Sequence, residues 1–276
     1  LLVTRTDQIS AAPLPKKEPS FAGVTWKDWI EIAKDKKHPN YLDAFEVLGE
    51  FPELGEKIIP EFRSSVCHPG DENTERVMRM IRMFNKNAKS AIPFLLEWVE
   101  KGDDDEASRA LGVLKEIGEA AKDTVPLLLK FSANWRPRVQ VNSYHFLPLV
   151  LFDIAPNDPV VIKYLKACYN NPNMKTKTKI AARLWQIERK EEYIDFLKVE
   201  LSSDSERRRF SVIQEFEEIL KIDPKFSKIF FEFAKTEKDS LSKNMAFGIL
   251  NRTKTVDPKS LPYFFVSCQL RKIHLI

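Results

Sequence analysis

A proline recurs in this chain at a nearly constant interval. Pro60, Pro93 and Pro126 are each separated from the next by 33 residues, and each directly follows a branched aliphatic residue. The same slot, continued in steps of 37, 32, 33 and 34 residues, falls on Lys163, Asp195, Lys228 and Pro262. A period of about 20 to 50 residues is typical of proteins built from repeated structural units. Seven copies of one unit therefore fit the chain from about Pro39 onward.

Apolar residues on both sides of this slot have helical spacing. Positions sixteen, twelve and nine residues before it are apolar in most copies, and these offsets place them on one face of an α-helix. The fifth copy fits only after a slip of one residue, and the seventh has Thr253 at its last apolar position. Two residues after the slot every copy is apolar: Phe62, Leu95, Leu128, Leu165, Leu197, Phe230 and Phe264. Each copy is predicted to be a helical hairpin, with proline in the first turn of the second helix, where its missing N–H costs nothing.

Residues that begin and end helices mark the turns. In the stretch EIGEAAKDTVPLLLKF (Glu116–Phe131), Gly118 ends one helix and Pro126 opens the next. The acidic run Lys101–Glu106 lacks the spacing of a calcium loop and precedes a helix, so we interpret it as a helix cap. Thr25, followed by an aspartate three residues later, predicts a further helix start.

These hairpins resemble HEAT repeats. The resemblance rests on ALGVLKEIGEAAKDTVPLLLKF (Ala110–Phe131) and on two looser copies, AFEVLGEFPELGEKIIPEF (Ala44–Phe62) and MIRMFNKNAKSAIPFLL (Met80–Leu96). From the fourth copy onward the family's Asp-x-x-Val-Arg motif, at the start of the first helix, is only approximated. The resemblance implies an all-α, right-handed α-α superhelix (a HEAT/armadillo-like solenoid) of about seven helical hairpins. It also implies that the second helix of each hairpin lines the concave side.

The N-terminal region differs in composition from the repeats. Residues 1–20 are polar and proline-rich, which predicts a flexible tail or linker. Residues 21–276 are predicted to form a single solenoid domain, in which 21–38 is a half-unit that caps the open end. The chain begins with Leu1, so a targeting segment upstream would make it an exported, periplasmic or secreted protein, and otherwise a cytoplasmic one. No apolar stretch approaches the roughly 18 residues of a membrane span, and a monomer is expected.

The sequence carries no recognisable catalytic or metal-binding motif. Its four histidines lack the spacing of a zinc site, and its three cysteines are far apart and are interpreted as free, buried thiols, although a disulfide between two of them stays open. Phosphate-binding glycine loops and nucleophile elbows are also absent from the sequence. We therefore predict no catalytic, cofactor-binding or metal-binding residue, no cofactor, and a protein that is not an enzyme.

The resemblance instead implies a protein–protein interaction scaffold that binds a partner protein or peptide on its concave face. Candidate contacts are a tryptophan in a loop and aromatic residues that follow the slot by one or five positions: Trp135, Phe94, Trp98, Tyr164, Phe196 and Tyr263. The alternative explanation of the aromatic stripe is packing between neighbouring second helices.

Nucleic acid provides the second functional hypothesis. HEAT-like folds include DNA glycosylases that remove alkylated bases, so a DNA-binding protein or an alkylpurine-DNA-glycosylase-like enzyme is the alternative. The net charge of the chain is only +4, and its acidic and basic residues are mixed. The outward positions of the predicted second helices are nearly neutral, unlike a phosphate-binding track, so a nucleic-acid partner is not favoured.

Overall fold

The chain divides into two compact units, one up to Phe94 and one from Leu95 onward. The computed structural model describes residues 18–62, 69–70, 73–134 and 142–255. The division falls within helix α5 (Ile92–Lys101). The prediction of a single domain over residues 21–276 stays a prediction.

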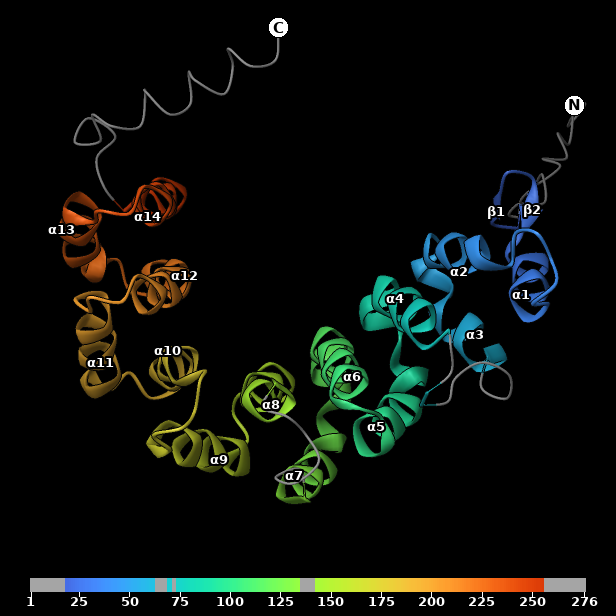
Figure 1. Cartoon of the computed structure of the whole chain (residues 1–276), viewed down its shortest axis with the longest axis horizontal. Helices are drawn as coiled ribbons and strands as arrows, with labels where there is room; N and C mark the ends of the chain where they lie inside the picture. Colours follow the sequence, from blue (N-terminus) through green and yellow to red (C-terminus); the bar gives the residue numbers. More distant parts are fainter. Residues whose placement is uncertain (1–17, 63–68, 71–72, 135–141, 256–276) are drawn as a thin grey trace, which may run out of the picture. The chain divides into compact units, whose positions relative to one another are not determined.

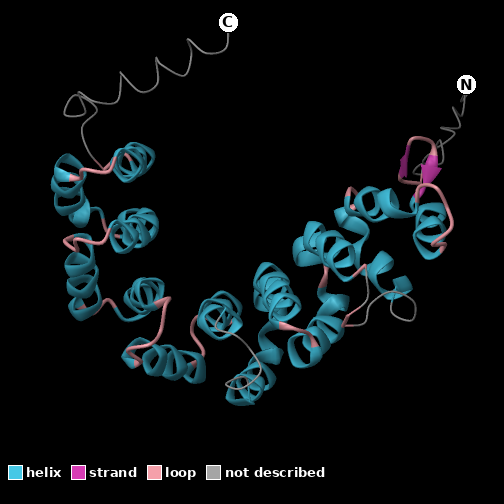
Figure 2. Ribbon diagram, viewed as in Figure 1, coloured by secondary structure: helices cyan, strands magenta, loops and turns pink. Residues whose placement is uncertain are grey.

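The first unit starts with a short β-hairpin, which is followed by helices. Strands β1 (Ser20–Phe21) and β2 (Val24–Thr25) pair antiparallel (Figure 2). The helices are α1 (Trp26–Lys34), α2 (Tyr41–Gly49), α3 (Gly55–Ile58) and α4 (Thr74–Phe84). The hydroxyl of Thr25 accepts the backbone N–H of Asp28 at 3.3 Å and caps α1, which is the helix start that the sequence predicts.

The second helix of the first copy is shorter than expected. It is a single α-helical turn, α3, followed by a 3-10 segment at Ile59–Phe62 that contains Pro60. Gly55, which has no side chain, allows this segment to approach the backbone of Asn87 closely. A Cβ atom at Gly55 would lie 2.5 Å from the carbonyl oxygen of Asn87, so a larger residue would push the segment away.

The second unit is a succession of helical hairpins (Figure 1). Its helices are α6 (Asp104–Ile117), α7 (Val125–Asn134), α8 (Asn142–Ile154), α9 (Pro159–Asn170), α10 (Lys177–Glu188), α11 (Glu191–Leu201), α12 (Glu206–Ile222), α13 (Ser227–Thr236) and α14 (Ser240–Thr253). Most described residues on the predicted apolar faces are buried, and the rings of Phe216 and Phe230 stack at 4.6 Å between α12 and α13. The predicted all-α solenoid fold is confirmed.

Local signals in the sequence have the structural roles that they predict. Asp103 and Glu106 form a capping box: the side chain of Asp103 accepts the N–H of Glu106 at 2.8 Å, and that of Glu106 accepts the N–H of Asp103 at 3.1 Å. Gly118 ends α6 with a φ of 67°, a backbone conformation that favours glycine. Pro126 is the second residue of α7, so its lack of an N–H breaks no helical hydrogen bond.

The two rows of helices in the second unit lie opposite to the expectation from the HEAT resemblance. First helices α6, α8, α10, α12 and α14 contact one another in succession, whereas second helices chiefly contact the first helices beside them. Within this unit, Figure 1 shows the first helices on the inner side of the curve and α9, α11 and α13 on the outer side. The expectation that second helices line the concave side is therefore corrected here. We call the first helices of this unit the inner row.

Within the described residues, none of the helices combines the length and the apolar character that a membrane span requires.

Candidate functional site

The predicted partner-binding aromatic residues have very different environments. Phe94 is 6% exposed and Trp98 is 0% exposed, so in this structure both side chains serve packing. Tyr164 and Phe196 are half-buried. Trp135 and Tyr263 lie outside the described residues. The role of these residues in partner binding stays a prediction.

Phe196 belongs to an aromatic cluster between two second helices. The ring of Tyr169 on α9 lies edge-on to Tyr193 and Phe196 on α11, with centroids 5.3 and 5.6 Å apart. The ammonium group of Lys177 lies 4.9 Å from the Tyr169 ring and 5.3 Å from the Phe196 ring. Packing between second helices, the alternative explanation of the stripe, accounts for these contacts.

Tyr164 lies beside the buried, free thiol of Cys168. Burial raises the pKa of Cys168 to about 11, and it also raises the pKa of Tyr164. A thiol with so high a pKa is almost entirely protonated at neutral pH and is a poor nucleophile. Cys168 therefore has the packing role expected of a free buried cysteine, while Cys67 and Cys268 lie outside the described residues.

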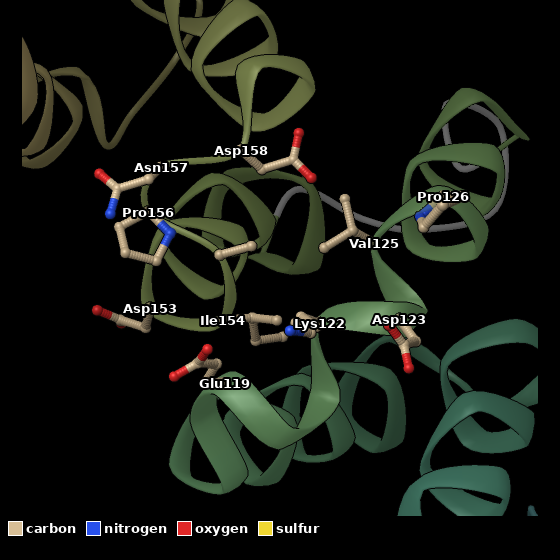
Figure 3. Close-up of a pocket in the computed structure, with 11 residues that line it drawn as sticks. Glu119, Lys122, Asp123, Val125, Pro126, Asp153, Ile154, Pro156, Asn157 and Asp158 are labelled. Atoms are coloured by element: carbon tan, nitrogen blue, oxygen red, sulfur yellow. The ribbon is translucent and has the colours of Figure 1, made fainter.

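A hollow of about 760 Å³ opens at the turns that connect α6 to α7 and α8 to α9. Figure 3 shows Glu119 and Asp153 near each other on one side and Asp158 on the opposite side. The lining is rich in carboxylates and includes Lys122. The side chain of Asp158 accepts the N–H of Val160 at 2.7 Å and caps α9, so this carboxylate has a structural role.

A cluster of ionisable side chains on the inner row meets the hollow at Asp153. It is assembled from four first helices: Lys115 on α6, Asp153 on α8, Lys179 and Arg183 on α10, and Glu215 on α12. Two ion pairs hold it together, Lys115 Nζ to Asp153 Oδ2 at 3.3 Å and Arg183 Nη1 to Glu215 Oε2 at 3.4 Å. We call these five residues the inner-row charge cluster.

Glu215 is the most buried member of the cluster, with 6% of its surface exposed. Burial raises the pKa of its carboxyl group, and the nearby negative charge of Asp153 adds to this effect. The positive charges of Arg183, Lys179 and Lys115 act in the opposite direction without cancelling it. A buried carboxyl group with a raised pKa among several charges is typical of functional sites, although structural networks also produce it.

Two donors at the cluster have no acceptor among the described residues. Both Nε of Arg183 and Nε2 of Gln186 are buried and make no hydrogen bond there. Below the Arg183 guanidinium lies the ring of Phe152, with its centroid 5.3 Å away. Buried polar groups of native proteins are nearly always hydrogen-bonded. Buried donors without an acceptor therefore indicate side chains whose presence the stability of the fold alone does not explain.

This cluster was not predicted from the sequence, because the HEAT resemblance implies a binding surface on the second helices. One signal was available in Glu215. It lies three residues after Val212 and four before Ile219, so helical spacing places a carboxylate on the apolar face of α12. Convergence of side chains from four helices cannot be read from spacing within any one of them.

Metal chemistry receives no support from the described part of the chain. It contains no group of three or more histidine, cysteine, aspartate or glutamate side chains placed to hold an ion. The prediction that no residue binds a metal or cofactor stays a prediction for the whole chain.

Comparison with known proteins identifies the fold but no family. No protein-family model matches this chain, and no curated protein matches it. A solved structure, the complex of CpcE and CpcF of phycocyanin lyase from Nostoc sp. PCC7120, contains a similar chain. The match covers 91% of this chain and 96% of that chain, with a TM-score of 0.53 and 15% sequence identity. At this identity the likeness shows the HEAT-like solenoid fold alone.

The same match corrects the prediction that the chain is not an enzyme. That prediction rested on a fold known for scaffolds and on the absence of catalytic motifs. The similar chain belongs to a lyase, so neither observation excludes catalysis, and the prediction is wrong.

Proposed function

We propose that this chain is a solenoid component of a lyase-type enzyme complex and binds a partner protein along the inner row of its second unit. The observation that carries the proposal is the inner-row charge cluster, in which α6, α8, α10 and α12 each contribute an ionisable side chain. The similar lyase structure supports it because that structure is a complex of two named proteins.

The character of the surface favours a protein over a small molecule as the main ligand. Pockets for small molecules are mostly apolar with a few polar groups. The hollow beside the cluster is instead lined by several charged side chains, among them Glu119, Lys122 and Asp123. Charges spread over four helices suit a large partner, which they would orient and select by complementarity.

Co-purification with a matched pair of variants tests this proposal. The tagged full chain is expressed in its own host and purified at low salt, and the stoichiometry of bound proteins is measured by quantitative mass spectrometry. Lys179→Glu reverses a charge of the inner-row cluster, whereas Lys163→Glu reverses an exposed charge on α9, a second helix outside the inner row. A near-stoichiometric partner that is lost with Lys179→Glu and retained with Lys163→Glu is expected. The proposal fails if no such partner is found or if both variants retain it equally.

DNA binding, the alternative from the sequence, also stays a prediction. A mobility shift with duplex DNA that weakens steeply with salt would support it, because phosphate contacts release counterions. Absence of a shift at low salt would exclude it.

A further inference from the structure

Positive charge exceeds negative charge in the inner-row cluster. Three cationic side chains, Lys115, Lys179 and Arg183, face two carboxyl groups, Asp153 and Glu215. Asp153 has one ion pair, with Lys115, and Glu215 has one, with Arg183, while Asp153 Oδ2 makes no hydrogen bond and Lys179 no ion pair within the described residues.

The guanidinium of Arg183 is engaged less completely than those of two other arginines in the same unit. Arg209 donates Nε and Nη2 to Glu237 at 2.7 and 2.9 Å, and Arg252 donates Nε and Nη2 to Glu217 at 3.2 and 2.6 Å. Both pairs have the two-point geometry that suits a carboxylate. Arg183 instead has its ion pair with Glu215 at 3.4 Å, from Nη1, and its Nε has no acceptor among the described residues.

Three donor side chains lie on one face of α10. Lys179, Arg183 and Gln186 are spaced by four and three residues, which places them one turn apart along that face. The amide of Gln186 adds a second donor that has no acceptor in the described structure. This face offers hydrogen-bond donors and positive charge, and Glu215, the ion-pair partner of Arg183, belongs to the next first helix.

We propose that the face of α10 formed by Lys179, Arg183 and Gln186 binds a carboxylate group of a ligand. A carboxylate brings negative charge to Lys179, which has no ion pair among the described residues, and its two coplanar oxygens match the Nε edge of a guanidinium. The pairing with Glu215 already places one carboxylate at this arginine.

Binding requires a small movement of Arg183, because its Nε is covered in this conformation. The side chain is 21% exposed and is held by one long ion pair and one ring face, so a tilt of the guanidinium breaks no hydrogen bond within the described residues. An unsatisfied buried donor makes the resting orientation less favourable, and a new acceptor compensates for the movement.

This inference does not depend on the proposed function. A free carboxylic acid or an aspartate or glutamate side chain of a protein would occupy the site with the same chemistry, and the experiment separates the two sources.

Side-chain NMR of the full chain tests the site directly. The Nε–Hε signals of arginines are recorded in ¹⁵N-labelled, deuterated protein during titration with succinate, and with the uncharged succinamide as control. The Arg183 signal is expected to move with succinate alone. Those of Arg209 and Arg252 should stay in place, since their Nε atoms already have carboxylate acceptors. A static Arg183 signal, or an equal response to succinamide, overturns the proposal.

Two variants and a peptide complete the test. Glu215→Gln removes the competing carboxylate and is expected to strengthen succinate binding several-fold, while Arg252→Gln is expected to leave it unchanged. Weaker binding by the folded Glu215→Gln protein contradicts the proposal. An acetylated, amidated Gly-Glu-Gly peptide presents the carboxylate on a polypeptide. Tighter binding of the peptide than of succinate assigns the site to a protein side chain, and the reverse order assigns it to a free acid.

Discussion

Two buried glutamates of the second unit have pKa values shifted in opposite directions. The carboxylate of Glu237 accepts two hydrogen bonds from Arg209 and further ones from the backbone N–H groups of Lys238 and Asp239. The bonds from Arg209 are the main cause of its lowered pKa. Glu215 has one long ion pair, so burial dominates and its pKa is raised. The first is a satisfied structural ion pair, and the second, at the candidate site, is longer and leaves Arg183 Nε without an acceptor among the described residues.

Replacing Glu237 with glutamine tests the structural pair. The change leaves Arg209 without its carboxylate partner in a mostly buried position, so we expect a loss of about 2 to 4 kcal/mol in the free energy of unfolding at pH 7. Urea denaturation measures this loss. The control is Glu232→Gln, which removes an exposed pair with Lys235 and should cost less than about 1 kcal/mol.

The stability difference between wild type and Glu237→Gln should depend on pH. A carboxyl group with a lowered pKa stabilises the fold above its unfolded value of about 4.3, and this contribution disappears as the pH falls through the folded pKa. We expect the difference to shrink below about pH 4. A difference that is constant from pH 7 to pH 3 would show that the ionised form is not the stabilising one.

Glu215→Gln should have the opposite pH dependence. Because the pKa of Glu215 is raised, the wild-type fold loses stability as the pH rises from about 4.3 through the folded pKa, and glutamine avoids this loss. The stability of the variant relative to wild type should therefore increase over this interval, as measured by denaturation at a series of pH values. A relative stability that falls as the pH rises would refute this assignment.

At the level of single elements, two glycines of α6 and its turn should respond oppositely to alanine. Gly118 has a φ of 67°, so Gly118→Ala should cost about 1 to 3 kcal/mol through backbone strain. Gly112 lies inside α6, and a Cβ there would meet open space, so Gly112→Ala should add about 0.5 to 1 kcal/mol. Thermal denaturation of the two variants measures both effects. Equal effects would show that backbone conformation is not the cause.

Helix ends could be predicted from this sequence where residues close in the chain determine them. The capping box at Asp103 and the helix end at Gly118 depend on neighbours within a few residues. The second helix of the first copy was predicted less well, because its apolar spacing does not reveal that it continues as a 3-10 segment around Pro60. Helix α9 starts at Pro159, four residues before the slot at Lys163, since Asp158 supplies an earlier cap.

At the level of the whole chain, periodicity predicts that hairpins stack but not which row lies inside the curve. That choice depends on how closely consecutive first helices approach, which is a sum over many contacts between copies. The same holds for the candidate site. The helical spacing of Glu215 predicts a carboxylate on an apolar helix face, but its proximity to Lys115, three first helices away, arises only when the unit is assembled.

The two compact units should also respond separately to core mutations. Phe45 is buried in the first unit and Phe216 in the second, so alanine at either should cost about 3 to 5 kcal/mol locally. In native-state hydrogen exchange, Phe45→Ala should accelerate exchange in α1 and α2, and Phe216→Ala in α12 and α13, because solenoid copies contact only their neighbours. Uniform acceleration across the chain would instead indicate one cooperative unit.

The inner-row charge cluster limits how the number of repeats in this chain can change during evolution. Repeat proteins readily gain and lose whole copies, because a hairpin that is duplicated or deleted still stacks on its neighbours. The five charges come from four successive hairpins, so loss of any one between Asp104 and Thr236 would remove or displace part of the cluster. These four hairpins would have to be inherited as a block, while copy number could vary outside it.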